Sequence, residues 1–256
     1  MLLIVGKSKS GKTHLLLEAP NLLLLEFDPA GEDTLVGKKD DMHIIRYAYT
    51  VKGEAERCQQ HLSFIENVLA GKITKERNDD ERKILAWAAT SPRTLAFDTI
   101  SNWSQMQIES LDDQYHDHFE KNNPTETLSQ GIYGFVMRRL HWLIPRLRVL
   151  DATVIFTAHI REDITKNREG VVINRIYSIQ MAGRKIVDIL HGCFSEIYLL
   201  QTKWNRKEKI PTSQNLITRS GSGYDFLGSR AGVPPTMEWP TVPKILKAIE
   251  EAKKGV

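Results

Sequence analysis

Continuous apolar runs, each bounded by polar residues or glycine, dominate the first two thirds of the chain. They predict buried strands over residues 2–5, 21–27, 42–47, 94–98 and 152–158. A run without alternation is typical of a parallel strand that is covered on both faces. Helical spacing between the runs predicts helices over 14–18 and 54–69, from a cap at Ser101 or Asn102 onward, and over 132–150 with a bend near Pro145.

The pattern changes after residue 158. A polar segment at 164–170, expected to be mobile, precedes residues 171–179, which alternate loosely as one arm of a hairpin would. Strands at 196–201 and 215–219 flank a basic turn at 203–209, and helices are predicted at 184–190 and 241–254. The sequence therefore predicts an α/β fold with a mainly parallel sheet sandwiched by helices and with antiparallel strands at one edge.

Two further segments are too polar for a core. Residues 72–85 are highly charged and are interpreted as an exposed loop leading into a helix. Residues 112–130 are interpreted as a flexible excursion. His116 and His118 in this excursion have no partners at metal-ligand spacing, so we interpret them as part of a solvated face.

Composition is that of a globular protein of 256 residues, with 41% hydrophobic and 26% charged residues. No apolar run reaches membrane-spanning length, and Met1 leads straight into the first strand, without the basic region of a signal peptide. Cys58 and Cys193 form no C-x-x-C pair, which favours thiols in a reducing, cytoplasmic compartment. Residues 160–230 hold twelve Lys and Arg against seven Asp and Glu, a modest indication of a polyanionic partner or, equally, a solvated lysine-rich surface.

The strongest chemical signal lies directly after the first strand. Residues 6–13 read GKSKSGKT, which matches the phosphate-binding pattern G-x-x-x-x-G-K-[S/T] between a strand and a helix. Backbone N–H groups of such a loop bind phosphate, Lys12 reaches the β- and γ-phosphates, and the Thr13 hydroxyl binds Mg²⁺. The predicted ATP contacts are Gly6, Lys7, Ser8, Lys9, Ser10, Gly11, Lys12, Thr13 and His14.

Acidic residues at strand ends supply the second part of a candidate site. Asp98 ends the run at 94–98, where a carboxylate can hold Mg²⁺ opposite Thr13; the alternative is a helix cap. Hydrolysis also needs a group that activates water, and the acids that follow the second strand are candidates: Glu26, Asp28 and Glu32. Asp28 is favoured because it lies just past the strand end, although an Asp before a proline is often only a turn residue.

His159 follows the strand at 152–158. At that strand end an imidazole can sense the γ-phosphate and report hydrolysis to the segment after it. The alternative is a strand-end histidine that hydrogen-bonds to the backbone.

These motifs together resemble the RecA-like ATPase superfamily. More narrowly, they resemble phage-encoded ATP-binding proteins, related to RecA and the Rad recombinases, that act in single-strand annealing and recombination. The resemblance rests on GKSKSGKT, LLLLEFD, LAFDTIS and VIFTAH, then on GRKIVDILHGCFSEIYLL and YDFLGSRAGVP. It implies a single RecA-like ATPase domain over 1–256, with a nucleotide-binding core at 1–160, a DNA-loop and edge-strand region at 161–235 and a C-terminal helix at 236–256.

The resemblance also implies roles for particular residues. Lys12, Asp98 and His159 match the phosphate-binding lysine, the Mg²⁺-binding aspartate and the strand-end sensor. The family pattern of Asp, one residue, then the water-activating Glu appears here with the carboxylates exchanged, as Glu26-Phe27-Asp28. A family Lys and Arg that reach a neighbouring subunit's γ-phosphate correspond to Gly228 and Arg230, so only the arginine is present.

The implied partners follow from the same resemblance. ATP with Mg²⁺ would lie between the subunits of a homo-oligomeric filament or ring, and single-stranded DNA would lie along the basic loops. A single-strand-binding protein is a further partner, and a bacterial host cytoplasm is the expected location if the chain is phage-encoded. The predicted DNA contacts are Lys166, Arg168, Arg175, Lys203, Arg206 and Lys207, with Trp204 as a stacking surface or simply a packed side chain.

The leading hypothesis is therefore an ATP-dependent single-stranded-DNA-binding protein of recombination or annealing. Three alternatives stay open: a RecA-fold motor of the helicase or packaging type, a nucleotide-gated binding protein with weak hydrolysis, and a small-molecule kinase. The exchanged carboxylates and the absent Lys keep the weak-hydrolysis alternative in view.

Overall fold

The computed structural model describes residues 1–27, 42–48, 51, 53–122, 128–181, 184–205, 210–221 and 224–255. Its contacts divide the chain into two compact units. The first unit comprises Met1–Ala19, Ile155–Gln180 and Val187–Val256, and the second comprises Pro20–Val154 and Met181–Ile186. The single domain predicted from the sequence, with bounds at residues 160 and 235, stays a prediction.

The first unit is built on three parallel strands with antiparallel strands beyond them. β1 (Leu2–Gly6) pairs in parallel with β5 (Thr153–Lys166, in this unit from Ile155) and with β7 (Glu196–Asn205). Beyond β7 lie β8 (Ile210–Ile217) and β10 (Thr236–Glu238), both antiparallel to their neighbours. β9 (Gly228–Ser229) pairs with the start of β7. The antiparallel edge predicted from the sequence is confirmed.

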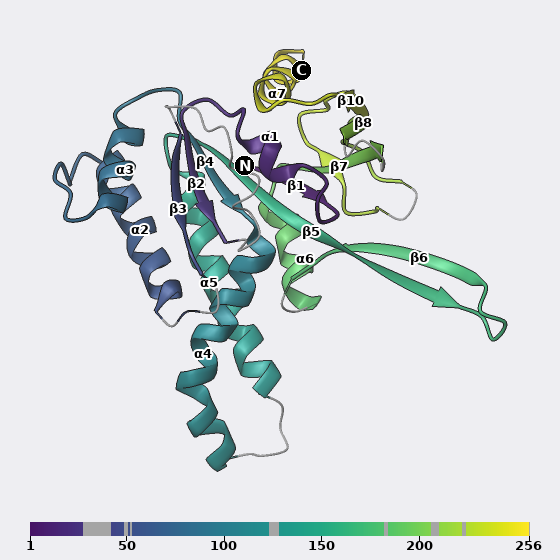
Figure 1. Cartoon of the computed structure of the whole chain (residues 1–256), viewed down its shortest axis with the longest axis horizontal. Helices are drawn as coiled ribbons and strands as arrows, with labels where there is room; N and C mark the ends of the chain where they lie inside the picture. The colour runs from purple at the N-terminus through teal and green to yellow at the C-terminus, as the bar shows by residue number, and fades with distance from the viewer. Residues whose placement is uncertain are drawn as a thin grey trace. The chain divides into compact units, whose positions relative to one another are not determined.

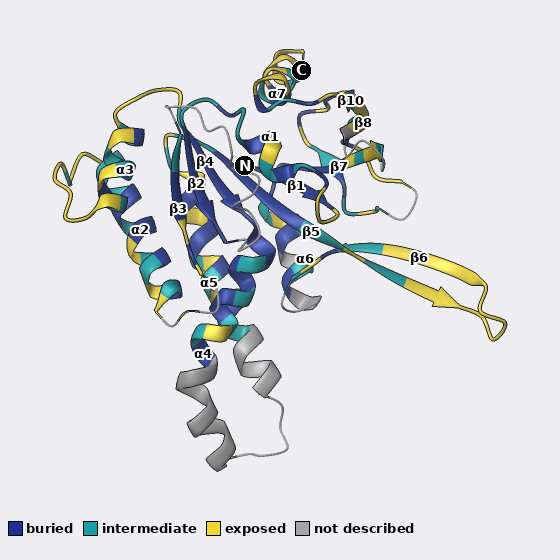
Figure 2. Ribbon diagram, viewed as in Figure 1, coloured by how far each residue is buried: buried dark blue, intermediate teal, exposed yellow. Residues whose placement is uncertain are grey.

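β5 continues into a long hairpin. Its residues after His159 pair with β6 (Val172–Ile179), so the segment expected to be mobile at 164–170 holds the end of β5 and the hairpin turn. The outer residues of β5 are mostly polar and do not continue the apolar run that ends at residue 158. A prediction that rests on the apolar run alone therefore ends the strand at that residue. Figure 2 shows the outer part of this hairpin exposed, in contrast to the buried β1.

Three helices complete the first unit. α1 (Lys12–Leu16) follows the loop after β1, α6 (Arg184–Cys193, in this unit from Val187) precedes β7, and α7 (Val242–Lys254) ends the described chain. α7 begins at a Thr241 cap, whose hydroxyl accepts a hydrogen bond from the Lys244 N–H at 3.2 Å.

The second unit has a parallel three-stranded sheet in the order β4 (Thr94–Asp98), β2 (Leu22–Glu26) and β3 (His43–Arg46). All five residues of β2 and all five of β4 are buried, as the continuous apolar runs predict. Phe27 stacks between Tyr47 and Phe97, with ring centroids 4.9 Å and 6.2 Å away. A fully buried side chain of this size contributes roughly 1.5–3 kcal/mol, so these strand ends are firmly packed.

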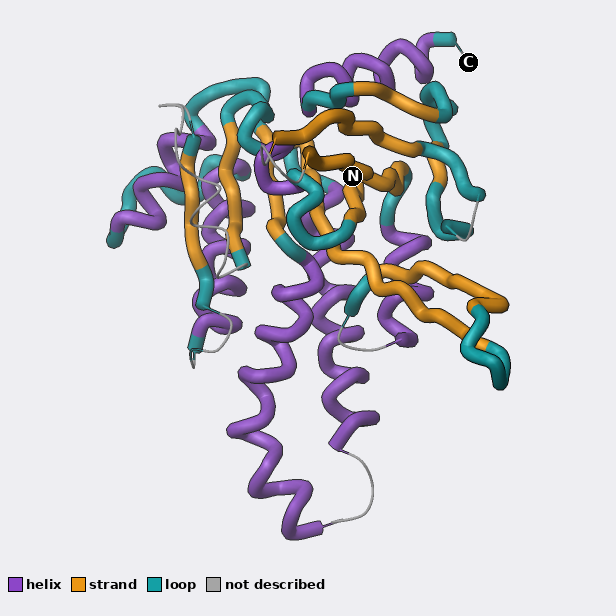
Figure 3. The backbone as a smooth tube through the Cα atoms, turned by 45° about the vertical axis from the view of Figure 1, so that its right-hand side comes forward, coloured by secondary structure: helices purple, strands orange, loops and turns teal. Residues whose placement is uncertain are grey.

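Four helices accompany that sheet: α2 (Glu54–Leu69), α3 (Asp79–Ala88), α4 (Ile100–Asn122) and α5 (Leu128–Arg148). The Trp87 indole of α3 donates to the carbonyl oxygens of Asn21 and Thr94, which ties this helix to the starts of β2 and β4. Figures 1 and 3 show α4 and α5 running side by side.

Two expectations for these helices were wrong. Residues 112–122 belong to α4 rather than to a flexible excursion, since polar Asp, Gln, Glu and Lys are compatible with a helix that begins on an apolar segment. The cap of α4 is Thr99, whose hydroxyl accepts the N–H of Asn102 at 3.2 Å, and not Ser101 or Asn102. The charged segment at 72–85 does lead into a helix, and α3 begins within it, after an Asn78 cap.

Candidate functional site

The glycine-rich loop begins where β1 ends. β1 is buried along its whole length, and Gly6 is its last residue. A Cβ at Gly6 would lie 2.5 Å from the Ser10 hydroxyl oxygen and 2.9 Å from the carbonyl oxygen of Leu200. Both distances are far below van der Waals contact, so this position accepts only glycine while the loop keeps its course.

The loop folds back over itself in a conformation that side chains seldom permit. Lys9 has a φ of 61° and Gly11 a φ of 85°, and the N–H of Ser10 donates to the Lys7 carbonyl at 3.2 Å. Alternating right- and left-handed backbone turns aim successive N–H groups at one point, which is the geometry of an anion-binding nest. Lys7, Ser8 and Lys9 are exposed, while Ser10 and Lys12 are buried.

Two polar residues of neighbouring strands hold this loop in place. Thr202 of β7 and Gln214 of β8 are cross-strand partners. The Thr202 hydroxyl donates to the Ser10 carbonyl at 2.6 Å, and the Gln214 amide donates to the same oxygen at 3.4 Å. Sequence reasoning missed both residues, because a lone Thr and a lone Gln in a half-polar strand carry no pattern.

Lys12 lies within the loop. Its ammonium group donates to the carbonyl oxygens of Gly6 at 3.1 Å and Lys7 at 2.9 Å, and it lies 3.4 Å from the Nδ1 atom of His159 on β5. The structure thus brings together the predicted phosphate lysine and the predicted sensor, which are 147 positions apart in the chain.

The residues present fit the phosphates of a nucleoside triphosphate. The Ser10 hydroxyl is buried and has no hydrogen-bond partner within the described part of the chain, so it is available to a phosphate oxygen. The Lys12 ammonium, which donates to the Gly6 carbonyl at 3.1 Å, supplies a positive charge in the same loop. When bound, the phosphates would bring Mg²⁺, for which the Thr13 hydroxyl is the candidate ligand from this loop.

The predicted acidic residues lie in the second unit, at the carboxyl ends of its strands. Asp98 ends β4 and is buried, and it lies opposite Glu26 at the end of β2. Glu26 is buried as well, and one of its carboxylate oxygens accepts the Arg46 Nε–H at 2.8 Å. Because Glu26 is held by Arg46, it is a poor candidate for the base. The favoured base, Asp28, lies outside the described residues.

Arg230 is placed at the far end of the strands that carry the loop. It directly follows β9, which pairs with the first residues of β7, and its N–H donates to the Ser195 carbonyl at 3.1 Å. β7 is parallel to β1, so Arg230 lies at the amino end of these strands and the loop at their carboxyl end, roughly 15 Å away. Arg230 therefore lies away from the loop of its own chain, and its role toward a neighbouring subunit stays a prediction.

The predicted DNA contacts that the structure describes divide between two hairpins of the first unit. Lys166, Arg168 and Arg175 are exposed on the β5–β6 hairpin, and Lys203 is on β7. Arg206 and Lys207 lie outside the described residues.

A salt-bridge chain joins the β5–β6 hairpin to the loop. Lys7 of the loop lies 3.6 Å from a Glu162 carboxylate oxygen, and the Arg175 Nε lies 3.0 Å from the other. The Tyr177 hydroxyl also donates to Glu162, at 3.2 Å, and its ring stacks on Tyr224 at 4.2 Å. Burial, together with the hydrogen bond to Tyr177, raises the pKa of Tyr224 to about 12. Glu162 could not be identified from the sequence, because an acidic residue within a basic stretch only reduces the net charge of that stretch.

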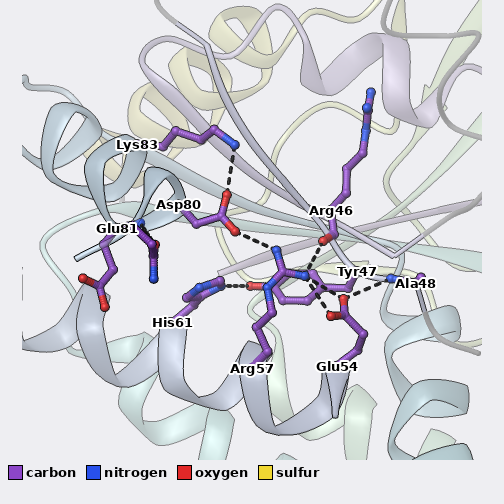
Figure 4. Close-up of polar contacts among 10 residues, drawn as sticks. Arg46, Tyr47, Ala48, Glu54, Arg57, His61, Asp80, Glu81 and Lys83 are labelled. Carbon is purple, nitrogen blue, oxygen red and sulfur yellow. Dashed lines mark hydrogen bonds and ion pairs between the residues drawn. The ribbon is translucent and has the colours of Figure 1, made fainter. Parts of the chain in front are cut away.

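A separate polar cluster lies in the second unit, between β3, α2 and α3 (Figure 4). The Arg57 guanidinium donates to Glu54 at 2.7 Å and to Asp80 at 2.6 Å, and Lys83 also donates to Asp80, at 2.9 Å. Despite partial burial, these ion pairs lower the pKa of Asp80. A pocket of about 460 Å³ adjoins them and is lined by Met42, His43, Ile44, Arg46, Arg57, Asp80 and Lys83.

The same cluster contains a buried aromatic pair. The Tyr47 hydroxyl lies 2.8 Å from the Nδ1 atom of His61. Burial raises the pKa of Tyr47 well above its ordinary value and lowers the pKa of His61. We therefore assign Tyr47 as donor and a neutral His61 as acceptor. This cluster was not predicted, because its charges read as a solvated surface.

The loop, its strand and the mainly parallel α/β architecture define a P-loop ATPase of RecA-like fold. A family model described as an AAA domain matches residues 1–224, and the chain belongs to this AAA-domain family. It is therefore an ATP-binding domain of the ATPase class. Among solved structures, the flagellar accessory protein FlaH from Methanocaldococcus jannaschii is 9% identical, with 93% of this chain and 83% of that chain covered and a TM-score of 0.35. No curated protein sequence matches the chain.

No described helix is both long and apolar enough to cross a membrane. No group of three or more His, Cys, Asp or Glu residues in the described ranges is placed to hold a metal ion. The side chains of His116 and His118 are not among those that the structure describes.

Proposed function

We propose that this ATPase binds single-stranded DNA in a nucleotide-dependent manner and acts in recombination or strand annealing, as its resemblance to RecA-related phage proteins implies. The observation that carries the proposal is the β5–β6 hairpin, which follows His159 directly and projects from the unit that holds the phosphate loop (Figure 1). Its outer residues are exposed (Figure 2). An isolated two-stranded ribbon is marginally stable in water, so a hairpin of this kind is suited to becoming ordered on a ligand.

The chemistry of the hairpin fits a polyanion with stackable bases. Among the residues that the structure describes, Lys166 and Arg168 have no carboxylate partner, so both charges are available to phosphates. Five apolar side chains on or beside the same strands are exposed by 41–63%: Ile164, Val171, Val172, Ile173 and Ile176. Arg175 is already paired with Glu162, which makes it a weaker DNA contact than the sequence predicted.

The nucleotide and the hairpin are joined through Glu162 and His159. Lys7 and Arg175 share the Glu162 carboxylate, and Lys12 lies beside His159. A γ-phosphate that draws Lys7 or Lys12 toward itself would release one partner of these contacts and so change the hairpin. In this proposal Thr13 and Asp98 hold Mg²⁺, Asp28 activates water, and Arg230 acts on ATP bound by a neighbouring subunit of a homo-oligomer.

The test is single-stranded DNA affinity in a double charge reversal, K166E/R168E, with ATP present. Losing two phosphate contacts is expected to weaken binding by about tenfold or more and to reduce the salt slope by roughly 1.4, at 0.7 per phosphate. The matched control is K253E/K254E on α7, which makes the same charge change on exposed lysines of the same unit. Equal effects of the two variants, or none from either, would contradict the proposal.

A further inference from the structure

Trp239 is an exposed aromatic residue held in an unusual backbone conformation. It follows the short edge strand β10, its side chain is 52% exposed, and its φ is 44°. A positive φ is rare for a bulky residue other than glycine and persists only where the surroundings fix it. A single exposed tryptophan does not by itself indicate a function. The informative feature of Trp239 is its position within the first unit.

The backbone on both sides of Trp239 is fixed. Its own N–H donates to the Gln214 carbonyl at 2.8 Å, and the Lys244 ammonium donates to the Glu238 carbonyl at 2.6 Å. Pro240 is buried, and Thr241 caps α7. The exposed ring is therefore carried by a rigid segment rather than by a loose loop.

The same segment is tied to the phosphate loop. Gln214, which accepts the Trp239 N–H, donates through its side chain to the Ser10 carbonyl at 3.4 Å. Its amide nitrogen would lie 2.8 Å from a Cβ at Gly11. Trp239 lies beside Gln214 on β8, and Gln214 lies opposite Thr202 on β7. Trp239 is therefore two strand spacings, roughly 10 Å, from Thr202, whose hydroxyl donates to Ser10.

We propose that Trp239 stacks on the purine base of the nucleotide whose phosphates the loop binds. The loop recognises phosphate through backbone N–H groups and Lys12, and these contacts do not distinguish one base from another or from none. The ribose separates the base from the phosphates by a distance comparable to the offset of Trp239 from the loop. An exposed indole on a fixed backbone is suited to base stacking, because little conformational entropy is lost on contact.

Trp204 supplies the comparison within the same unit. It is exposed to a similar extent, 46%, but it lies beyond a register shift in the β7–β8 hairpin, opposite Pro211. Its backbone has no comparable connection through Gln214 to Ser10. The same substitution at Trp204 therefore controls for the loss of an exposed indole.

The inference rests on nucleotide binding by the loop and not on DNA binding. It is tested with two probes, ATP and inorganic tripolyphosphate, each titrated with Mg²⁺ in a calorimeter and without DNA. W239A is expected to raise the Kd for ATP by about tenfold and to leave tripolyphosphate binding unchanged, since only the base contact is lost. W239F, which keeps an aromatic face, should retain most of the ATP affinity, and W204A should match the wild type.

Three results would overturn the inference. ATP affinity unchanged in W239A would mean that the ring does not touch the base. An equal loss for ATP and tripolyphosphate would mean that Trp239 acts on the loop through Gln214. Failure of the charge-reversal test on the hairpin would leave this inference standing, because neither probe requires DNA, whereas a wild-type protein that bound neither probe would overturn the nucleotide site and this inference together.

Discussion

Two polar clusters of this protein use buried charge in different ways. In the loop after β1, the Lys12 ammonium donates to the carbonyl oxygens of Gly6 and Lys7, and the buried Ser10 hydroxyl has no partner within the described part of the chain. Between β3, α2 and α3, by contrast, Arg57 and Lys83 are neutralised by Glu54 and Asp80. The ion pairs of Arg57 and Lys83 stabilise the fold, whereas Lys12 lies in the phosphate-binding motif, where its ammonium can contact an anionic ligand. Variants in the two clusters should therefore separate binding from stability.

The largest effect is expected at Gly6. G6A places a Cβ 2.5 Å from the Ser10 hydroxyl oxygen and 2.9 Å from the Leu200 carbonyl oxygen, so the loop must shift. We expect loss of ATP affinity by at least about a hundredfold and destabilisation by about 1–3 kcal/mol, as for overpacked sites. Calorimetric titration with ATP and urea unfolding measure the two effects.

Gly134 on α5 is the matched control for Gly6. A Cβ there meets nothing within 4 Å, so G134A should leave ATP affinity unchanged and stabilise the helix by about 0.5–1 kcal/mol. If G6A bound ATP as tightly as G134A does, the loop geometry described above would be wrong.

A smaller and opposite pattern is expected at Arg57. R57A removes hydrogen bonds to Glu54 and Asp80, and we expect destabilisation by about 1 kcal/mol, a discounted figure because the side chain is 35% exposed, with ATP affinity unchanged. The control is R82A on α3, whose side chain is 67% exposed and pairs with Asp79. It should change stability by less than about 0.5 kcal/mol in urea unfolding. Equal stability of the two variants would show that the cluster does not hold α2 and α3.

A further effect is a pH dependence carried by His61. Burial lowers its pKa below the ordinary 6.5, so the unfolded chain takes up a proton at a higher pH than the folded chain does. The stability that a neutral His61 provides is complete above pH 6.5 and is lost as the pH falls from 6.5 toward the folded-state pKa. The slope from this proton is at most about 1.4 kcal/mol per pH unit.

Urea unfolding between pH 7.5 and 5 measures this slope. H61Q has no proton to take up and should flatten the slope over that window, whatever its effect on stability at pH 7.5. An unchanged slope would mean that His61 is protonated alike in the folded and unfolded chains.

Much of the fold was predictable because buried parallel strands leave continuous apolar runs. β1, β2, β4 and the first half of β5 follow from those runs, and the loop follows from its motif between strand and helix. The outer half of β5 was not predictable, since Glu162, Asp163 and Lys166 carry no apolar signal and only pairing with β6 makes them a strand. In the same way, the helical content of 112–122 has no apolar periodicity that marks it.

The candidate site was predictable only where a residue type and a spacing coincide. Lys12 and His159 were identified, and the structure places them 3.4 Å apart. Thr202, Gln214 and Glu162 were not identified, because each acts through a contact that only the folded sheet creates. Polar residues that support a site from neighbouring strands leave no trace in a single sequence.

ATP hydrolysis by the full chain, with and without single-stranded DNA and with K12A measured alongside, tests the proposed function most directly. We expect hydrolysis that single-stranded DNA stimulates and that K12A abolishes in both conditions, because in the proposal Lys12 contacts the phosphates and the hairpin responds to them through Lys7 and His159. Hydrolysis that is indifferent to DNA, together with unmeasurable DNA affinity, would contradict the DNA-binding proposal. Hydrolysis or ATP binding that survives in K12A would contradict the assignment of the loop itself.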